Sequence, residues 1–317
     1  MDKRELIALT LIKGQGVGNS FIKKNLDALR CTSSIVECLL RFLPEFDTET
    51  YAEKCLPQAE RIIQECAEKM YTIVCIGDAD YPSSLFEIGD PPAVLYMKGN
   101  QALLGNAIAV IGTRHSTSLG EKIAEKIGVY YSTSYSICNG LAEGIDKHAI
   151  YHNGSVLPNV IGVISGGLNF ESTCSKSCAA IIKDVLAAGG LIISEFPPYQ
   201  KVDQFAGSKV SRVQAGLSKA LILVQSSMTG GSKYTLKAYS KLNRPLGIIH
   251  FPSHEEYSCD VFGANRAIIE KGLNGVAEFL GLKTTKGLSF SKIMKIESVA
   301  DYPHLLAPDE MNDNKLF

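Results

Sequence analysis

Short apolar runs, separated by helical stretches, recur along the chain from about residue 106 onward. Their starts lie about 25–30 residues apart, which is the length of a strand followed by a helix. The runs cover Ile108–Gly112, Ser136–Gly140, Ile161–Gly166, Leu191–Phe196, Ala220–Gln225 and Leu246–Phe251. The pattern therefore predicts six strands that alternate with helices.

Each of these runs is continuously apolar and does not alternate with polar residues. A strand needs this composition when helices cover both faces of its sheet. Strands that alternate with helices build an open, mainly parallel sheet. The sequence thus predicts an α/β fold of the Rossmann-like, doubly wound type.

The rest of the chain divides around this central region. Residues 1–70 predict a small helical N-terminal domain, because their apolar positions follow helical spacing. Residues 71–76 and 93–99 predict two further strands, so we expect an extended Rossmann-like domain over residues 71–280. Residues 281–317 are weakly patterned and predict a C-terminal tail or a small appended element.

Composition places the chain among ordinary globular proteins. Hydrophobic residues make up 45% of its 317 residues and charged residues 21%. The chain has no apolar stretch long enough to cross a membrane and no signal-peptide pattern, so we expect a cytoplasmic protein. The formal net charge of −1 argues against a surface covered in positive charge, but it permits a local basic groove.

The cysteines indicate neither a metal site nor a disulfide framework. The nine cysteines are scattered, and no Cys-x-x-Cys pair occurs. Cys174 and Cys178 form the one close pair, without partners at zinc spacing. We expect reduced thiols and no metal.

Candidate chemistry lies in the loops that follow the predicted strands. The carboxyl ends of parallel strands form the ligand-binding edge of such a sheet. Glycine lets backbone N–H groups approach an anion, and the start of the following helix adds its positive dipole end. Glycine-rich loops after the first, second, third and fifth runs therefore predict a shared phosphate-binding site. The loops are Gly112–Ser116, Asn139–Gly144, Ser165–Asn169 and Ser226–Ser232.

Two common nucleotide motifs are missing from these loops. No Gly-x-Gly-x-x-Gly follows the first strand, and the second strand does not end in an acidic residue. No Gly-x-x-x-x-Gly-Lys-Ser/Thr loop occurs either. The sequence therefore disfavours NAD, FAD and ATP, and we expect no cofactor.

The ordered loop motifs resemble the DNA-processing protein A (DprA/Smf) family, over about residues 71–275. The resemblance implies an extended Rossmann-like domain that binds single-stranded DNA and forms a homodimer. In the family, such proteins help a RecA-type recombinase during DNA uptake and recombination. The motifs are Tyr81-Pro82, Pro91-Pro92, Leu95–Asn100, Ile111–Arg114, Gly140–Asp146, Gly166–Asn169, Ile193–Glu195, Ala215–Ser218, Gly230–Thr235, Asn243–Pro245 and Gly263–Asn265. Upstream, Gly16-Val17-Gly18 resembles the hairpin of a helix–hairpin–helix.

Site residues follow from the loops and the resemblance together. Arg114 is expected to neutralise a phosphate, Lys209, Arg212 and Lys233 to extend a basic track, and Asp146 to brace the second loop. The full set expected to bind phosphate or nucleic acid is Gly112, Thr113, Arg114, Asn139, Gly140, Gly144, Ser165, Gly166, Gly167, Lys209, Arg212, Gly230, Gly231, Ser232 and Lys233.

The chain departs from the family pattern at several of these places. Asn139 stands where the family has serine, Gln225 where it has glutamate, and Val210-Ser211-Arg212 where it has Arg-Asn-Arg. These changes suggest a specialised paralogue, with defence against foreign DNA as one role that would fit.

Two alternatives remain open at this stage. The fold is related to that of phosphoribohydrolases and nucleotide sensors, for which Glu143, Asp146 and Glu195 would be the acid–base candidates. A scaffold for protein partners is the other alternative, although it leaves the loop glycines unexplained. The sequence favours a non-enzymatic protein that binds single-stranded DNA, with no catalytic residue assigned.

Overall fold

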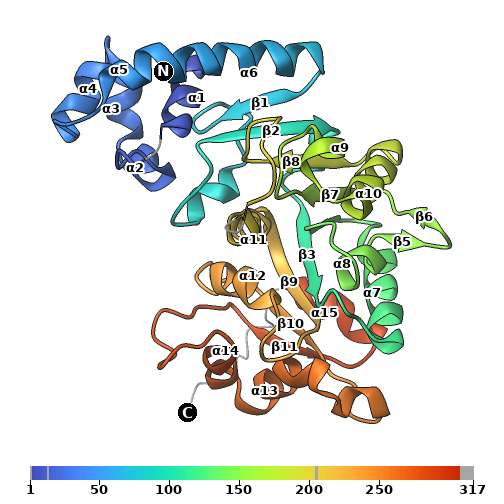
Figure 1. Ribbon diagram of the computed structural model, residues 1–317. Coiled ribbons are helices and arrows are strands. Elements are labelled where there is room, and N and C mark those ends of the chain that lie inside the picture. Colours follow the sequence, from blue (N-terminus) through green and yellow to red (C-terminus); the bar gives the residue numbers. More distant parts are fainter. Residues whose placement is uncertain (1, 13, 204–205, 308–317) are drawn as a thin grey trace.

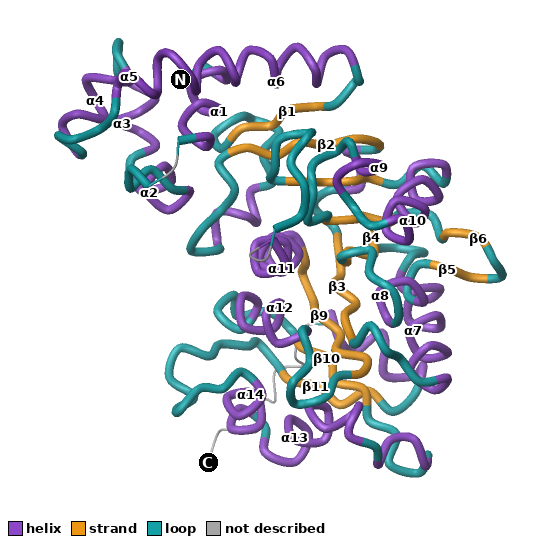
Figure 2. The backbone as a smooth tube through the Cα atoms, viewed as in Figure 1, coloured by secondary structure: helices purple, strands orange, loops and turns teal. Residues whose placement is uncertain are grey.

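The structure is a computed structural model that describes residues 2–12, 14–203 and 206–307. Its centre is a nine-stranded sheet in the order β1-β2-β8-β7-β4-β3-β9-β10-β11 (Figures 1 and 2). The strands are β1 Thr72–Cys75, β2 Val94–Gly99, β3 Ala107–Gly112, β4 Ser136–Asn139, β7 Val160–Val163, β8 Leu191–Ser194, β9 Ser218–Gln225, β10 Leu246–Ile249 and β11 Ile293–Ile296.

The sheet is doubly wound around β3. The chain first adds β4, β7 and β8 on one side of β3 and then returns to add β9, β10 and β11 on the other, all parallel. β1 and β2 extend the β8 edge as antiparallel strands. The predicted α/β Rossmann-like fold with a mainly parallel sheet is confirmed. The order of strands reverses next to β3, where such sheets bind their ligands.

Helices cover both faces of the sheet, as the apolar strands require. Figure 1 shows α7 and α10 to one side of the strands and α11 and α12 to the other. Polar side chains start two of these helices, because Thr117 and Ser175 accept backbone N–H bonds from Gly120 and Cys178. The helices are α7 Ser118–Tyr131, α8 Ile145–His148, α9 Phe170–Thr173, α10 Lys176–Ala187, α11 Ala206–Leu217, α12 Ser232–Tyr239, α13 Gly263–Lys271, α14 Leu273–Phe279 and α15 Tyr302–Leu306.

The N-terminal helices lie over the β1–β2 edge of the sheet (Figure 1). The Lys3 ammonium donates to the Ile73 carbonyl over 2.8 Å, and the Asn19 side chain accepts the Ala93 N–H at 3.0 Å. A turn with positive φ at Gly14 and Gly16 joins the first two helices. The elements are α1 Lys3–Leu11, α2 Asn19–Lys24, α3 Leu26–Cys31, α4 Ile35–Phe42, α5 Thr48–Thr50, a π-helical turn Tyr51–Cys55 and α6 Leu56–Glu68. Among the described residues, no helix has the length and apolar character that a membrane crossing needs.

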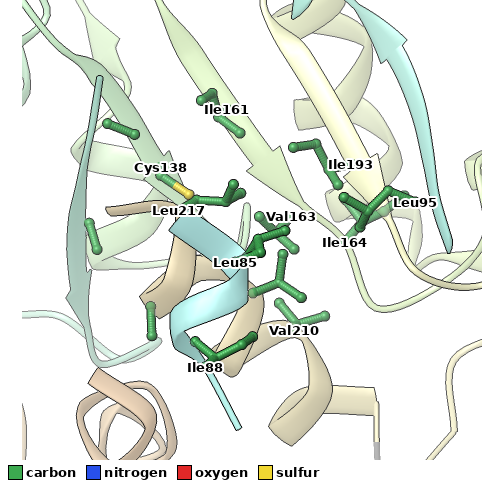
Figure 3. Packing of buried hydrophobic residues seen from close by; sticks show 14 of the residues in the cluster. Leu85, Ile88, Leu95, Cys138, Ile161, Val163, Ile164, Ile193, Val210 and Leu217 are labelled. Carbon is green, nitrogen blue, oxygen red and sulfur yellow. The ribbon is translucent and has the colours of Figure 1, made fainter. Parts of the chain in front are cut away.

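Two apolar side chains, Leu85 and Ile88, anchor the segment between β1 and β2 against α11. Leu85 belongs to the 3₁₀ turn η2, Ser83–Glu87, and Ile88 follows this turn; both point toward α11 (Figure 3). Both side chains are buried. A Cβ atom at Gly216 of α11 would lie only 2.7 Å from the Leu85 side chain, so this contact depends on glycine.

Two features of the fold have no counterpart in the expected strands. β11 pairs with β10 in parallel and adds a ninth strand within the weakly patterned C-terminal stretch. A small hairpin, β5 Tyr151–His152 and β6 Ser155–Val156, follows α8.

The remaining short 3₁₀ turns are η3 Gln101–Leu103, η4 Glu255–Ser258, η5 Asp260–Phe262 and η6 Val299–Asp301. Residues 308–317 of the expected tail lie outside the described residues.

The burial of Leu85 against α11 predicts how much this contact contributes to stability. Leu85→Ala should lower the free energy of unfolding by about 2–5 kcal/mol, because Leu85 is fully buried and its loss leaves a cavity. Leu273→Ala removes the same atoms from a side chain that is 42% exposed, and should cost less than half as much. Urea unfolding of both variants measures the difference. Equal losses would show that the Leu85 contact adds nothing particular to stability.

Candidate nucleic-acid interface

The loops after β3 and β4 pack directly against each other at the reversal of the strand order. Gly144 has φ +78°, and a Cβ atom there would lie 2.4 Å from the Thr113 carbonyl and 2.6 Å from the Arg114 carbonyl. The Ile145 N–H donates to the Thr113 carbonyl over 3.1 Å. The structure therefore brings together the two motifs that the sequence placed at the centre of the site.

Several of the predicted phosphate-binding glycines are required by packing. A Cβ atom at Gly112 would lie 2.4 Å from the Ile145 side chain, and one at Gly167 would lie 2.0 Å from the Pro197 carbonyl. The Gly167 N–H already donates to the Gln200 carbonyl over 2.8 Å. These glycines allow close approach of neighbouring segments, and the Gly167 amide is not free for an anion.

In the loop after β7, a glycine likewise allows a neighbouring segment to approach closely. A Cβ atom at Gly166 would lie 2.9 Å from the Thr173 carbonyl, and the Thr173 hydroxyl donates to the Gly167 carbonyl over 2.6 Å. Ser165, which precedes them, is half-buried. This loop is therefore tied to the end of α9 and lies beside the β3 and β4 loops at the same edge of the sheet.

Asp146 and Asn139 brace the loop after β4 from inside. The Asp146 carboxylate accepts the N–H groups of Gly140 at 3.0 Å and Ala142 at 3.5 Å. The Asn139 amide donates to the Asp146 carbonyl over 2.8 Å and accepts the Leu141 N–H at 3.0 Å. Burial raises the pKa of the Asp146 carboxyl to about 6, while these N–H groups and the charge of Arg114 act in the opposite direction.

The start of α12 leaves open space on one side of its first residues. A Cβ atom at Gly231 would meet no atom within 4 Å, so the space beside this glycine is empty. The Ser232 hydroxyl is buried and has no hydrogen-bond partner among the described residues. Gly230, in contrast, packs against the Ser226 hydroxyl and donates its N–H to the Ser227 carbonyl. Because a helix N-terminus carries free N–H groups and a positive dipole end, Gly231 and Ser232 form the part of the loop best suited to a phosphate.

Arg114 lies exposed beside these loops. It makes no hydrogen bond or ion pair with any described residue, so its guanidinium is available to a ligand. Its charge acts to lower the pKa values of Asp146 and Cys178, which places it near both. Thr113, next to it, donates its N–H to the Gln225 carbonyl over 2.8 Å and has a structural role in the loop.

Two other predicted basic residues are held in different ways. The Arg212 guanidinium forms ion pairs with Glu195 at 2.6 Å and Asp90 at 3.1 Å, and only 12% of its side chain is exposed. Lys209 is exposed and lies over the Phe196 ring at 5.1 Å from the centroid. Arg212 therefore joins α11 to the end of β8 and to the segment before β2, whereas Lys209 keeps an accessible charge.

Gln225 also has a structural role. Its side-chain oxygen accepts the Thr117 N–H at 3.1 Å, and its amide donates to the Thr117 hydroxyl over 3.2 Å. Thr117 is the N-cap of α7. The amide that stands in place of the family's glutamate thus fixes the end of the Arg114 loop.

A pair of thiols borders the loop after β7. A hydrogen bond from the Cys178 thiol lowers the pKa of Cys174 to about 7. All nine cysteines are free. Within the described ranges, no group of three or more histidine, cysteine or acidic side chains is arranged to hold a metal.

One basic surface was missed in the sequence-based assignment. Residues 204–254 contain seven lysines and arginines and no aspartate or glutamate. Within this stretch, Lys237 and Lys241 are exposed, and neither forms an ion pair with a described residue. The run without acidic residues is the signal that could have revealed this surface, and the net charge of the whole chain conceals it.

The comparisons with known proteins identify the family. A family model described as DNA recombination-mediator protein A matches residues 72–278. The chain belongs to this family. The predicted membership of the DprA/Smf group is thereby confirmed.

Curated relatives of the family match the same region. The chain is 31% identical over 203 residues to the DNA processing protein DprA of Bacillus subtilis, which covers 63% of this chain and 67% of the relative. It is 33% identical over 163 residues to DprA of Streptococcus pneumoniae, covering 50% of this chain and 55% of the relative. The chain thus spans about half to two thirds of the length of these relatives.

Two solved structures share the fold. The X-ray structure of DprA from Streptococcus pneumoniae aligns with a TM-score of 0.69 and 23% identity, covering 86% of this chain and 93% of that chain. A structure that describes the single-stranded DNA binding mode of DprA from Helicobacter pylori aligns with a TM-score of 0.55 and 24% identity, covering 64% and 88%. At these identities the alignments establish the fold.

The distinction between packed and open glycines can be tested by unfolding. Gly167→Ala should lower the free energy of unfolding by at least 1–3 kcal/mol, because its Cβ would overlap the Pro197 carbonyl. Gly231→Ala should change it by no more than about 0.5 kcal/mol, because the Cβ enters open space. Urea titration of both variants provides the measurement. Similar losses in the two variants would contradict the packing explanation.

The raised pKa of Asp146 predicts a pH-dependent contribution to stability. The pKa of about 6 in the folded protein exceeds the usual value of about 3.9, so the folded state holds this proton more tightly. The contribution is fully present below about pH 4 and is lost as the pH rises through 6. Asp146→Asn should remove this decline.

Unfolding free energies of wild type and Asp146→Asn at pH 4.5 and 7 measure this effect. The wild type should lose stability relative to the variant between the two pH values. Parallel pH profiles would show that Asp146 titrates at its ordinary pKa. Glu143→Gln is the matched control, since its carboxylate is exposed and forms an ion pair with Lys147.

Proposed function

We propose that this chain binds single-stranded DNA at the carboxyl ends of β3, β4 and β9, as a non-enzymatic protein of DNA processing and recombination. The observation that carries the proposal is the start of α12, at the sheet edge that also carries Arg114. The space beside Gly231 is open there, and the Ser232 hydroxyl has no hydrogen-bond partner among the described residues. Membership of the DNA recombination-mediator family supports it. The named single-stranded DNA binding mode of the Helicobacter pylori relative supports the choice of ligand.

The electrostatics of the region fit a phosphate backbone. A strand of nucleic acid is held largely by Lys and Arg contacts to phosphates, and its affinity therefore falls as salt rises. Arg114, Lys209 and Lys233 are the predicted site residues that keep a charge outside any ion pair with the described residues. Arg212 contributes by fixing α11, and its own charge is balanced by Glu195 and Asp90.

No observation favours the alternative of a nucleotide sensor or hydrolase. Its three candidate carboxylates are already engaged: Glu195 pairs with Arg212, Glu143 pairs with Lys147, and Asp146 accepts two backbone N–H groups. A general acid or base needs a side chain within reach of the substrate. The specialised role in defence, the cytoplasmic location, the homodimer and the RecA-type partner expected from the family belong to the same proposal.

Substitution of Arg114 tests the DNA-binding site. Arg114→Ala should weaken binding to a single-stranded oligonucleotide by about tenfold or more at low salt, because one charge-assisted contact of roughly 1.5 kcal/mol is lost. The slope of log affinity against log salt should become shallower by about 0.7 for one lost phosphate contact. Filter-binding titration at two salt concentrations, with single-stranded and duplex oligonucleotides, measures both effects.

Matched variants sharpen this test. Arg114→Lys should retain most of the salt slope, since it keeps the charge. Arg41→Ala removes an exposed arginine from α4, which lies far from β3 and β9 (Figure 1), and should leave binding unchanged. An affinity of Arg114→Ala equal to that of wild type at low salt would remove Arg114 from the site.

A further inference from the structure

Helix α12 presents two chemically different faces. Ser232, Thr235, Leu236 and Tyr239 are buried against the rest of the fold. Tyr234 and Lys237 are exposed on the other face, three residues apart, which places them on adjacent turns of one helix surface. Neither residue is needed to fill the core, so the composition of this face requires another explanation.

Tyr234 is an exposed aromatic ring without a structural role. Its side chain is 52% exposed, and its hydroxyl has no hydrogen-bond partner among the described residues. The one ring contact recorded for it is the Lys233 ammonium, 5.6 Å from the ring centroid. A tyrosine normally buries its ring or uses its hydroxyl, and Tyr234 does neither with the described part of the chain.

This ring stands in the first turn of α12, as does Ser232, but on the exposed side of the helix. Tyr234 follows Ser232 by two residues, and Lys233 lies between them. A ligand phosphate at Gly231 and Ser232 would therefore have a cation and an aromatic ring within the same turn of helix. Nucleotides carry a flat aromatic base beside each phosphate, and a single strand leaves that base free to stack.

The surrounding charge favours a polyanion. Lys233 and Lys237 lie four residues apart on α12, which corresponds to a rise of about 6 Å, and Lys241 follows just past the end of this helix. None of them forms an ion pair with a described residue, and residues 204–254 contain no acidic side chain. A docking surface for an apolar protein segment would not need this repeated positive charge.

We propose that Tyr234 is a stacking platform for a base of single-stranded nucleic acid, on the exposed face of α12, where Lys237 and the Lys241 side chain just past the helix attract the following phosphates. The proposal rests on the proposed single-stranded DNA binding, and it adds a residue that contacts a base by stacking. Bases in a duplex are stacked on their neighbours and cannot reach an exposed ring. Tyr234 therefore contributes to the preference for single strands, whereas Arg114 and the start of α12 recognise phosphate alone.

The decisive experiment compares a single-stranded oligothymidylate with an abasic strand of equal length. Fluorescence anisotropy measures the affinity of wild type, Tyr234→Ala and Tyr234→Phe for both strands. Tyr234→Ala should weaken binding to the oligothymidylate by about tenfold, which is within the range for loss of one base–aromatic stack. It should leave binding to the abasic strand unchanged, and Tyr234→Phe should bind both strands as wild type does.

Controls separate stacking from folding. Phe42→Ala removes another exposed aromatic ring, at the end of α4 and far from α12, and should leave both affinities unchanged. Since Tyr234 is exposed, thermal unfolding of Tyr234→Ala should match that of wild type. A strand carrying 2-aminopurine should change its fluorescence on binding to wild type and to Tyr234→Phe, and less on binding to Tyr234→Ala.

The outcomes distinguish this proposal from the one on which it rests. If Tyr234→Ala binds the oligothymidylate as tightly as wild type, or weakens binding to both strands equally, the stacking role is overturned while DNA binding stands. If wild type binds neither strand, both proposals are overturned. Capture of a protein partner that depends on Tyr234, without any effect on oligothymidylate binding, would assign this face to protein recognition and would also overturn the stacking role.

Discussion

The candidate interface depends on the close contact between the loop after β3 and the loop after β4. Gly144 makes this contact possible, because the carbonyl groups of Thr113 and Arg114 occupy the space where a Cβ atom would lie. Asp146 then fixes the β4 loop through backbone N–H groups, and Gln225 fixes the far end of the β3 loop through Thr117. With its backbone held at both ends, Arg114 is positioned at the sheet edge by the fold. Pre-organisation of this kind lowers the entropy that is lost when a ligand binds.

The sequence was sufficient to predict the central sheet, because its strands are buried on both faces. Such strands must be continuously apolar, and the runs that become β3, β4 and β7–β10 show that composition directly. β11 lies at the edge of the sheet, where Ile293 and Met294 are half-buried and Lys295 is exposed. An edge strand with one neighbour needs little apolar character, and its partner β10 is distant in the sequence. Its formation could not be inferred from local pattern.

The site was only partly predictable, because the role of a glycine depends on what lies across from it. The sequence identified the glycine-rich loops and assigned Asp146 to the second of them, where its carboxylate accepts two backbone N–H groups. It could not separate Gly167, whose missing side chain makes room for Pro197, from Gly231, which faces open space. The difference between these two glycines depends on contacts with residues that are distant in the sequence. The same limit applies to Arg212, whose partner Asp90 is 122 residues away along the chain.

The distribution of ion pairs explains how a nearly neutral chain can offer a basic surface. Arg212 and Arg244 are neutralised by Glu195, Asp90 and Glu87, and these pairs tie α11 and the start of β10 to the segment before β2. The acidic side chains are thereby used to stabilise the scaffold. Lys233 and Lys237 of α12, and Lys241 just past its end, have no such partners within the described residues, so their positive charge is not balanced locally. The arginines of this region thus hold the scaffold together, and the exposed lysines supply the uncompensated charge on which the proposed binding surface depends.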